Sequence, residues 1–278
     1  MPPTSSFRKG RSRATPAKPG VADLVAGHLP TYGDYLRLPD LLAQQCPRST
    51  PPVHDELLFI TVHQTYELWF RQMLIELTDA RDRLMRGETY LPRLRLQRCH
   101  VVERLLVSQF DVLDTMSPFD FLQFRHGLGS SSGIQSVQFH EIELLSGLND
   151  PHRPHQSRLA SKADRERLRR RLAEPTLWDG LLTVLRKAGF DVSTKPERIA
   201  TYTRIARNRE EHADLWDLTE ALVEHDQAWA AWRIRHTLTV ERQIGARPGT
   251  GGTAGGSYLT SRHDTRFYPE LWECRMPL

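Results

Sequence analysis

The feature that most constrains the fold is a long run, from His54 to Met85, that contains neither glycine nor proline. Within it, six residues recur at intervals of four, three, four, three and four positions: Phe59, His63, Tyr66, Phe70, Met73 and Leu77. Residues with this spacing share one face of an α-helix. Gly87 then follows, and glycine commonly ends a helix. The sequence therefore predicts one long amphipathic helix with a histidine on its apolar face.

The rest of the chain also favours helices. A second long helix is predicted from about Arg93 to Met116, stopped by Pro118, and a third from about Glu210 to Ile244. Shorter helical stretches are expected up to Leu148 and over 165–188 and 195–207, whereas 29–39 reads as an ordered arm rather than a helix. Strand patterns are scarce. We therefore predict an all-α fold, with a single helical-bundle domain over residues 29–278 and a disordered basic tail over 1–28.

Charge and composition narrow the function classes. The net charge is +4, but Lys and Arg concentrate in the tail and in RLASKADRERLRRRL, which mixes both signs at helical spacing. A solvated helix face explains that segment better than a nucleic-acid site. No apolar run approaches the roughly 20 residues that span a bilayer, and no apolar stretch follows the basic N-terminus as in a secretory signal. Three widely spaced cysteines (Cys46, Cys99 and Cys274) without a CxxC pair favour a reducing, cytoplasmic setting.

Two histidines, His63 and His236, lie on apolar helix faces among aromatic residues. A single histidine in such a place is most often a core residue with a satisfied hydrogen bond. Two of them on separate long helices raise a second interpretation, because helix bundles hold haem between facing helices with histidine as the axial ligand. A zinc site of the HExxH type and a di-iron site with Glu-x-x-His pairs both lack their motifs here.

Two loops carry further candidate residues. The segment 249–256, GTGGTAGG, matches GxGxxA, but it follows a helix and a proline rather than a strand, which excludes a dinucleotide site. It is either a flexible connector or a mobile lid to which Thr250 contributes a hydroxyl. Arg125 follows two phenylalanines and precedes the small-residue loop GLGSSSG. It is either a surface charge or a clamp for a carboxylate, with Ser131, Ser132 and Gly133 near the same ligand.

Composition and spacing thus give a helical protein able to hold haem, without specifying a reaction. A reaction is suggested by five collinear strings: TYGDYL (31–36), FITVHQTYELWF (59–70), FLQFRHGLGSSSGIQS (121–136), WRIRHTLTVERQIGARPGTGGTAGGSYL (232–259) and YPELW (268–272). In order and separation they resemble the tryptophan 2,3-dioxygenase family, over most of residues 29–278.

The resemblance implies one haem b per subunit, with His236 as the proximal iron ligand and His63 as the distal catalytic histidine that hydrogen-bonds the indole N–H. It implies a homotetramer that converts L-tryptophan and O2 to N-formyl-L-kynurenine in the kynurenine pathway of tryptophan catabolism. The resemblance also implies the substrate-binding residues: Phe59 and Phe121 would form the walls of the indole pocket, and Arg125 would bind the carboxylate. Thr250, Ser132 and Gly133 would lie at the amino-acid end of the substrate. Tyr32, Tyr35 and Leu36 would reach into the pocket of a neighbouring subunit.

Several positions depart from the family pattern, namely Ile134, His140, Ala254 and Gly255. They motivate a rival interpretation, in which a biosynthetic relative mono-oxygenates tryptophan or a substituted (for example β-methyl) tryptophan to a 2-oxindole. A haem-binding sensor without turnover explains the two histidines but not Arg125 and Thr250. A nucleic-acid-binding module rests on the basic tail alone.

Overall fold

The computed structural model describes residues 29–148 and 161–276, and within these ranges it contains helices and no strand. This confirms the predicted all-α fold class. The predicted tail, residues 1–28, lies outside the described residues, as does most of the loop expected before residue 163. The chain divides into two compact units, one ending at Gln45 and one from Cys46 to Leu278. Each is described by itself.

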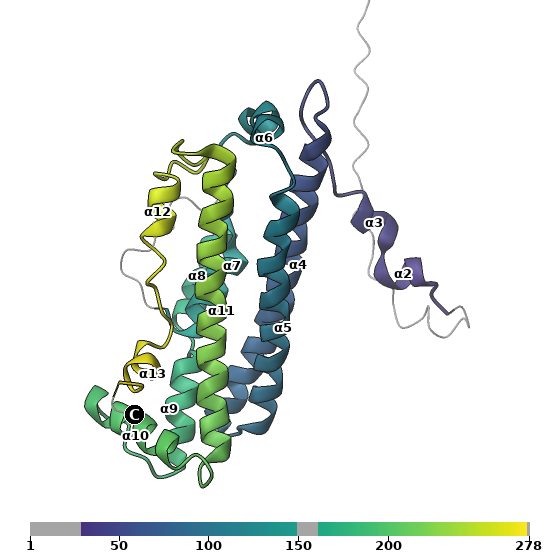
Figure 1. The fold of residues 1–278 in the computed structure, drawn as a ribbon. Helices are drawn as coiled ribbons and strands as arrows, with labels where there is room; N and C mark the ends of the chain where they lie inside the picture. The colour runs from purple at the N-terminus through teal and green to yellow at the C-terminus, as the bar shows by residue number, and fades with distance from the viewer. Residues whose placement is uncertain (1–28, 149–160, 277–278) are drawn as a thin grey trace, which may run out of the picture. The chain divides into compact units, whose positions relative to one another are not determined.

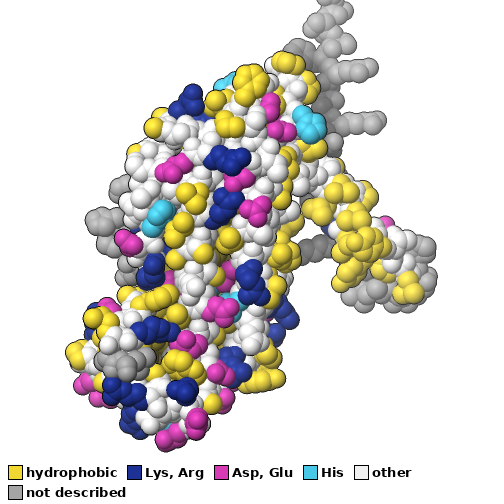
Figure 2. Space-filling model, in the orientation of Figure 1, with side chains coloured by type: hydrophobic (Ala, Val, Ile, Leu, Met, Phe, Trp, Pro, Cys, Tyr) yellow, Lys and Arg dark blue, Asp and Glu magenta, His cyan; other side chains and the backbone are white. Residues whose placement is uncertain are grey.

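The first unit contains two short helices, α2 (Tyr32–Leu36) and α3 (Leu38–Leu42). The expectation of an arm without helix over 29–39 was therefore wrong. A capping box explains α2, since the Thr31 hydroxyl accepts a hydrogen bond from the Asp34 backbone N–H while the Asp34 carboxylate accepts one from Thr31. Neither helix contains a buried residue, and apolar side chains cover much of their visible face in Figure 2.

The second unit is built on three long helices that run side by side in Figure 1: α4 (His54–Arg86), α5 (Tyr90–Leu113) and α11 (Ala213–Ile244). Each was predicted to within a few residues. Gly87 ends α4 with a φ of 89°, a left-handed conformation that costs glycine little. Helix α5 packs against both α4 and α11, so the faces of all three helices meet.

Shorter helices complete the unit. They are α6 (Pro118–Arg125), α7 (Val137–Ser146), α8 (Lys162–Leu172), α9 (Leu177–Lys187), α10 (Lys195–Arg207), α12 (Gly256–Thr260) and α13 (Pro269–Glu273), with 3-10 turns at His126–Leu128 (η1) and Gly133–Gln135 (η2). The single helical stretch expected over 165–188 is in fact two helices, because Pro175 interrupts it and Thr176 caps α9. Helix α6 was not predicted. Its first residue is Pro118, which we expected to stop the preceding helix, although α5 already ends at Leu113, and the Ser117 side chain caps α6.

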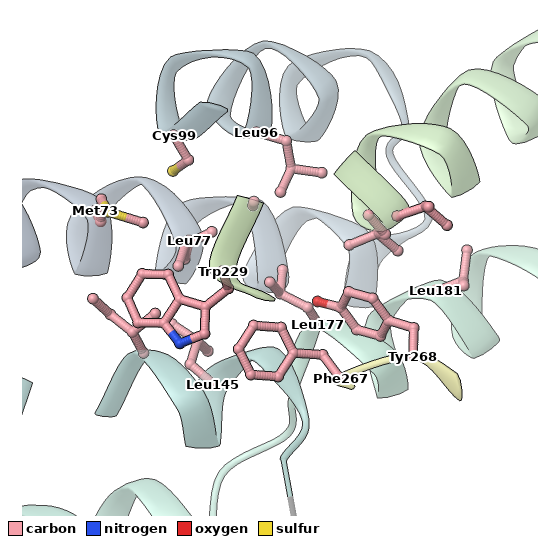
Figure 3. Packing of buried hydrophobic residues seen from close by; sticks show 14 of the residues in the cluster. Met73, Leu77, Leu96, Cys99, Leu145, Leu177, Leu181, Trp229, Phe267 and Tyr268 are labelled. Carbon is pink, nitrogen blue, oxygen red and sulfur yellow. The ribbon is translucent and has the colours of Figure 1, made fainter. Parts of the chain in front are cut away.

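The core lies where these helices meet, and Figure 3 shows part of it. Trp229 from α11 is fully buried, beside Leu77 of α4 and Leu145 of α7. Phe267 and Tyr268, which precede α13, close the same cluster. The segment that leads into α13 therefore docks on the body.

One polar network is also buried in this core. His225 of α11 hydrogen-bonds Glu103 of α5 through Nδ1 at 2.5 Å and Ser146 of α7 through Nε2 at 2.8 Å. All three side chains are almost completely buried. Because each needs the others to satisfy its hydrogen bonds away from water, the network links three helices in one relative position.

The outer surface carries both signs of charge, with apolar side chains between them (Figure 2). Among the helices of the described ranges, none is both long enough and apolar enough to cross a membrane.

Candidate functional site

The first element of the site is His236 on α11. Its ring stacks on Trp232, one turn earlier, at 5.0 Å between centroids, and on Phe110 of α5 at 5.8 Å. Across the described residues, no side chain or backbone group hydrogen-bonds this ring. Burial lowers the pKa of His236 to about 4. The ring is therefore neutral at ordinary pH, and its nitrogen lone pair is available to a ligand.

The second element is His63 on α4. Its Nδ1 is 2.7 Å from the carbonyl oxygen of Phe59, one turn earlier. A carbonyl only accepts, so Nδ1 carries the proton, and the neutral ring keeps a lone pair on Nε2. Charge on His63 also lowers the pKa of His236, beside the larger effect of burial.

His63 is exposed to solvent, yet the protein atoms around its ring lower its pKa by desolvation. The ring is therefore accessible to a ligand at a place that many protein atoms surround.

Aromatic rings join the two histidines. The Tyr66 ring is 6.5 Å from that of His63, 5.7 Å from Phe110 and 6.3 Å from Trp232. Its hydroxyl donates to the Leu106 carbonyl oxygen at 2.7 Å, which fixes the ring against α5. The region between the histidines is therefore walled by flat, apolar groups.

A second group of rings continues the wall from His63 towards α6. Phe59 contacts the His63 ring at 4.0 Å, Phe121 at 5.7 Å and Phe124 at 5.6 Å between centroids. Phe121 is one turn before Arg125 on the same helix, so α6 presents a ring and a guanidinium on one side. The structure thus brings Phe59 and Phe121 together.

Two loops meet beyond Arg125. The Arg125 Nη2 donates to the Pro248 carbonyl oxygen at 2.6 Å, and the Thr250 hydroxyl donates to the Ser131 carbonyl oxygen at 2.5 Å. Gly251 lies so close to Ser132 that a Cβ there would be 2.8 Å from the Ser132 Cβ. The glycine-rich segment therefore covers the 129–136 loop, and a side chain at 251 would push the two apart.

The remaining predicted substrate-binding residues lie in different parts of the structure. Ser132 caps η2, which Gly133 opens, so both lie in the loop that Thr250 and Gly251 contact. Tyr32, Tyr35 and Leu36 belong to the first unit, where they are 75%, 78% and 41% exposed, and their relation to this site is not defined. Sequence reasoning missed Phe110 and Phe124 as wall residues. Their only signal was an aromatic ring at a core position of a predicted helix or beside Arg125.

The donor set fits the haem that the resemblance implies. Haem iron needs one neutral imidazole with an unengaged nitrogen, and His236 supplies it. Flat aromatic side chains suit a flat macrocycle, and the stacked rings of Phe110 and Trp232 flank this histidine.

These features describe an all-helical bundle in which aromatic rings link two imidazoles, with a guanidinium on the neighbouring helix α6. Comparison with known proteins is more specific. The tryptophan 2,3-dioxygenase family profile matches residues 17–192 and 183–278. A tryptophan 2,3-dioxygenase of Nocardioides sp. is 50% identical over 252 residues, which are 89% of this chain and 94% of that protein.

Two further relatives carry the same name. The tryptophan 2,3-dioxygenase of Myxococcus xanthus is 38% identical over 94% of each chain. That of Caulobacter vibrioides is 39% identical over 89% of this chain and 98% of its own. The chain belongs to the tryptophan 2,3-dioxygenase family.

Proposed function

We propose that the protein is a haem-dependent oxidoreductase that uses O2 to cleave the indole C2–C3 bond of L-tryptophan, giving N-formyl-L-kynurenine. Both oxygen atoms enter the product, one at C2 and one at C3, as the O–O and C2–C3 bonds break. The reaction needs no external reductant. The observation that carries the proposal is the group of aromatic rings that links His63 to His236, in a chain of this family.

In this proposal His236 holds one haem b per subunit as its proximal iron ligand. Haem bound there would supply the ferrous iron that the reaction with O2 requires. The low pKa of His236 keeps its ring neutral, so that protons do not compete with the iron for the nitrogen near neutral pH.

His63 orients the indole. Its Nδ1–H is already engaged by Phe59, so Nε2 accepts the indole N–H as a hydrogen bond. Phe59 and Phe121 pack against the indole and exclude water from the reacting bond.

Arg125 holds the substrate carboxylate. Its Nη2 binds the Pro248 carbonyl oxygen, and the other guanidinium N–H groups remain to donate to an anion. Thr250, Ser132 and Gly133 surround the amino-acid end through the two contacting loops. An indole without this end would lose these contacts.

We also propose a homotetramer in which Tyr32, Tyr35 and Leu36 complete the site of a neighbouring subunit. Their high exposure supports this, since large apolar side chains seldom stay exposed on a short helix without a partner. The buried thiols Cys99 and Cys274 suit a cytoplasmic enzyme of tryptophan catabolism.

The proposal is tested by the product formed from L-tryptophan and isotope-labelled O2 with the reduced, haem-loaded protein. Two labelled atoms in an N-formylkynurenine product establish the dioxygenase. A single labelled atom in a 2-oxindole would instead assign the mono-oxygenase role. If the protein shows no turnover and no indole amino acid changes its haem spectrum, the result would assign the role of a haem-binding sensor.

A further inference from the structure

A buried histidine on α7, His140, has a contact that the proposed reaction does not use. Its side chain is 7% exposed, and its Nε2 is 2.8 Å from the carbonyl oxygen of Ile134. Because a carbonyl accepts, Nε2 carries the proton and donates. Ile134 belongs to η2, in the loop that also contains Ser132 and Gly133. We propose that His140 is a positioning residue that holds this loop in the conformation that binds the amino-acid end of the substrate.

The place of Ile134 makes this bond effective. Its side chain lies beside Gly251, where an added Cβ would be 3.1 Å from the Ile134 Cγ2. The neighbouring Thr250 donates to the Ser131 carbonyl oxygen. The loop is thus held by two segments, by α7 through His140 and by the glycine-rich segment through Thr250.

The His140 ring is closely surrounded by its neighbours. Its Nδ1 is 3.7 Å from Glu143, one turn later on α7, and has no hydrogen bond among the described residues. Glu143 is engaged by Arg233 of α11 at 3.0 Å, and Arg233 also donates to the Thr265 carbonyl oxygen. The Phe139 ring lies 5.8 Å from the His140 ring, edge to face. The imidazole is therefore enclosed, with one nitrogen directed at the loop.

Arg233 is one turn before His236 on the same helix. The chain of contacts Ile134–His140–Glu143–Arg233 accordingly runs from the substrate loop to the helix that carries the proposed iron ligand. This packing gives His140 a rigid support, because both α7 and α11 belong to the core cluster.

The inference rests on the proposed function only for the identity of the substrate. Two variants separate the hydrogen bond from the volume of the ring. In His140→Leu the donor is lost. In His140→Gln an amide N–H lies at about the reach of Nε2 and can donate to Ile134. Each variant is first checked for its haem spectrum and melting temperature.

The first readout is amide hydrogen exchange over residues 129–136 in the haem-loaded protein without substrate. We expect faster exchange in His140→Leu and near wild-type exchange in His140→Gln. The second is the Kd for L-tryptophan and for 3-methylindole, measured by titration of the haem absorption band. We expect His140→Leu to raise the Kd for L-tryptophan by up to about tenfold, which is the loss that one neutral hydrogen bond accounts for, and to leave the Kd for 3-methylindole unchanged.

Unchanged loop exchange in His140→Leu would overturn the inference, and so would equal weakening of both ligands or failure of Gln to restore binding. If the leucine variant does not fold, His140→Asn, whose amide is too short to reach Ile134, takes its place. If the wild type binds no L-tryptophan, the proposed function fails by itself, and the exchange data still decide whether His140 holds the loop.

Discussion

At the scale of single residues, the sharpest prediction concerns His236. We expect His236→Ala to lose stable haem, because the alanine removes the imidazole that stacks on Phe110 and Trp232 and leaves no ligand nitrogen at this position. The measurement is the haem absorption band that survives gel filtration. His54→Ala, at an exposed imidazole, is the matched control. Added free imidazole should restore haem to the alanine variant, and retention of normal axial ligation without it would refute the role.

His63 gives a prediction about pH. Burial lowers its pKa from the usual 6.5, so the neutral form that accepts the indole N–H persists at pH values where an exposed histidine is already protonated. Activity should therefore stay constant as pH falls from 8 to 6.5 and decline only below that. The measurement is kcat/KM for L-tryptophan against pH. In His63→Gln, the amide oxygen still accepts but does not titrate, so the acid decline should vanish. A midpoint at or above 6.5 would contradict this account.

How much of the site the sequence predicts is clear from these two residues. Helical spacing placed each histidine on an apolar face, and the match of long motifs suggested their roles. That one group of aromatic rings links the two histidines depends on how α4 and α11 pack through α5, which local patterns do not encode. The contact between His140 and Ile134 is of the same kind, since a lone histidine near a loop has no sequence signal of its own.

At the scale of elements, we predict that L-tryptophan binding depends on the close contact between the 129–136 loop and the glycine-rich segment 249–256. In Gly251→Ala the new Cβ would be 2.8 Å from the Ser132 Cβ, so the glycine-rich segment must move away. We expect a loss of about 1–3 kcal/mol in L-tryptophan binding with an unchanged haem spectrum. In Gly127→Ala, a Cβ would meet nothing within 4 Å, so this variant is the control. Equal effects of both changes would refute the packing argument.

The buried network between helices is testable in the same way. Ser146→Ala leaves His225 Nε2 without its partner in the core, which should lower the free energy of unfolding by about 1–3 kcal/mol. Denaturant unfolding measures it. Ser108→Ala, which removes an exposed hydroxyl bonded to the Leu105 carbonyl oxygen on α5, should have a much smaller effect. Similar losses in the free energy of unfolding of the two variants would mean that the buried hydrogen bond stabilises the fold no more than the exposed one does.

Element boundaries show where sequence reasoning ends. The long helices were predictable because their apolar positions repeat over many turns. Pro175 and Thr176 indicate that one helix ends and another begins there, but the basic and apolar pattern around them continues at helical spacing and hides this boundary. Helix α2 depends on a capping box within a short segment, which has too few turns for a periodic pattern. In both places a local hydrogen bond decided the structure over periodicity.

At the scale of the whole molecule, a periodic row of exposed apolar side chains indicates how the chain assembles with other copies. Helix α5 exposes an apolar stripe with members seven, four and seven residues apart: Leu94, Val101, Leu105 and Val112. These intervals place them on one face of the helix. Such a row in water marks an association surface, and on α11 Ile234 and Leu238 are likewise exposed.

The proposed tetramer should therefore depend on this stripe. The chain is 32.0 kDa, so light scattering should give about four times that mass for the wild type. Val101→Glu places a charge on the stripe and should shift the mass towards smaller species, because a buried unpaired carboxylate is costly. Leu172→Glu, at a similarly exposed leucine on α8, is the matched control and should leave the mass unchanged.

Activity then tests whether assembly completes the site. If Tyr32, Tyr35 and Leu36 act in a neighbouring subunit, activity per haem should fall together with mass in Val101→Glu. In Tyr35→Ala, activity should fall while the tetramer persists. A fully active monomer, in the wild type or in Val101→Glu, would show that each chain forms its site alone, and the exposed side chains of α2 would then need another partner.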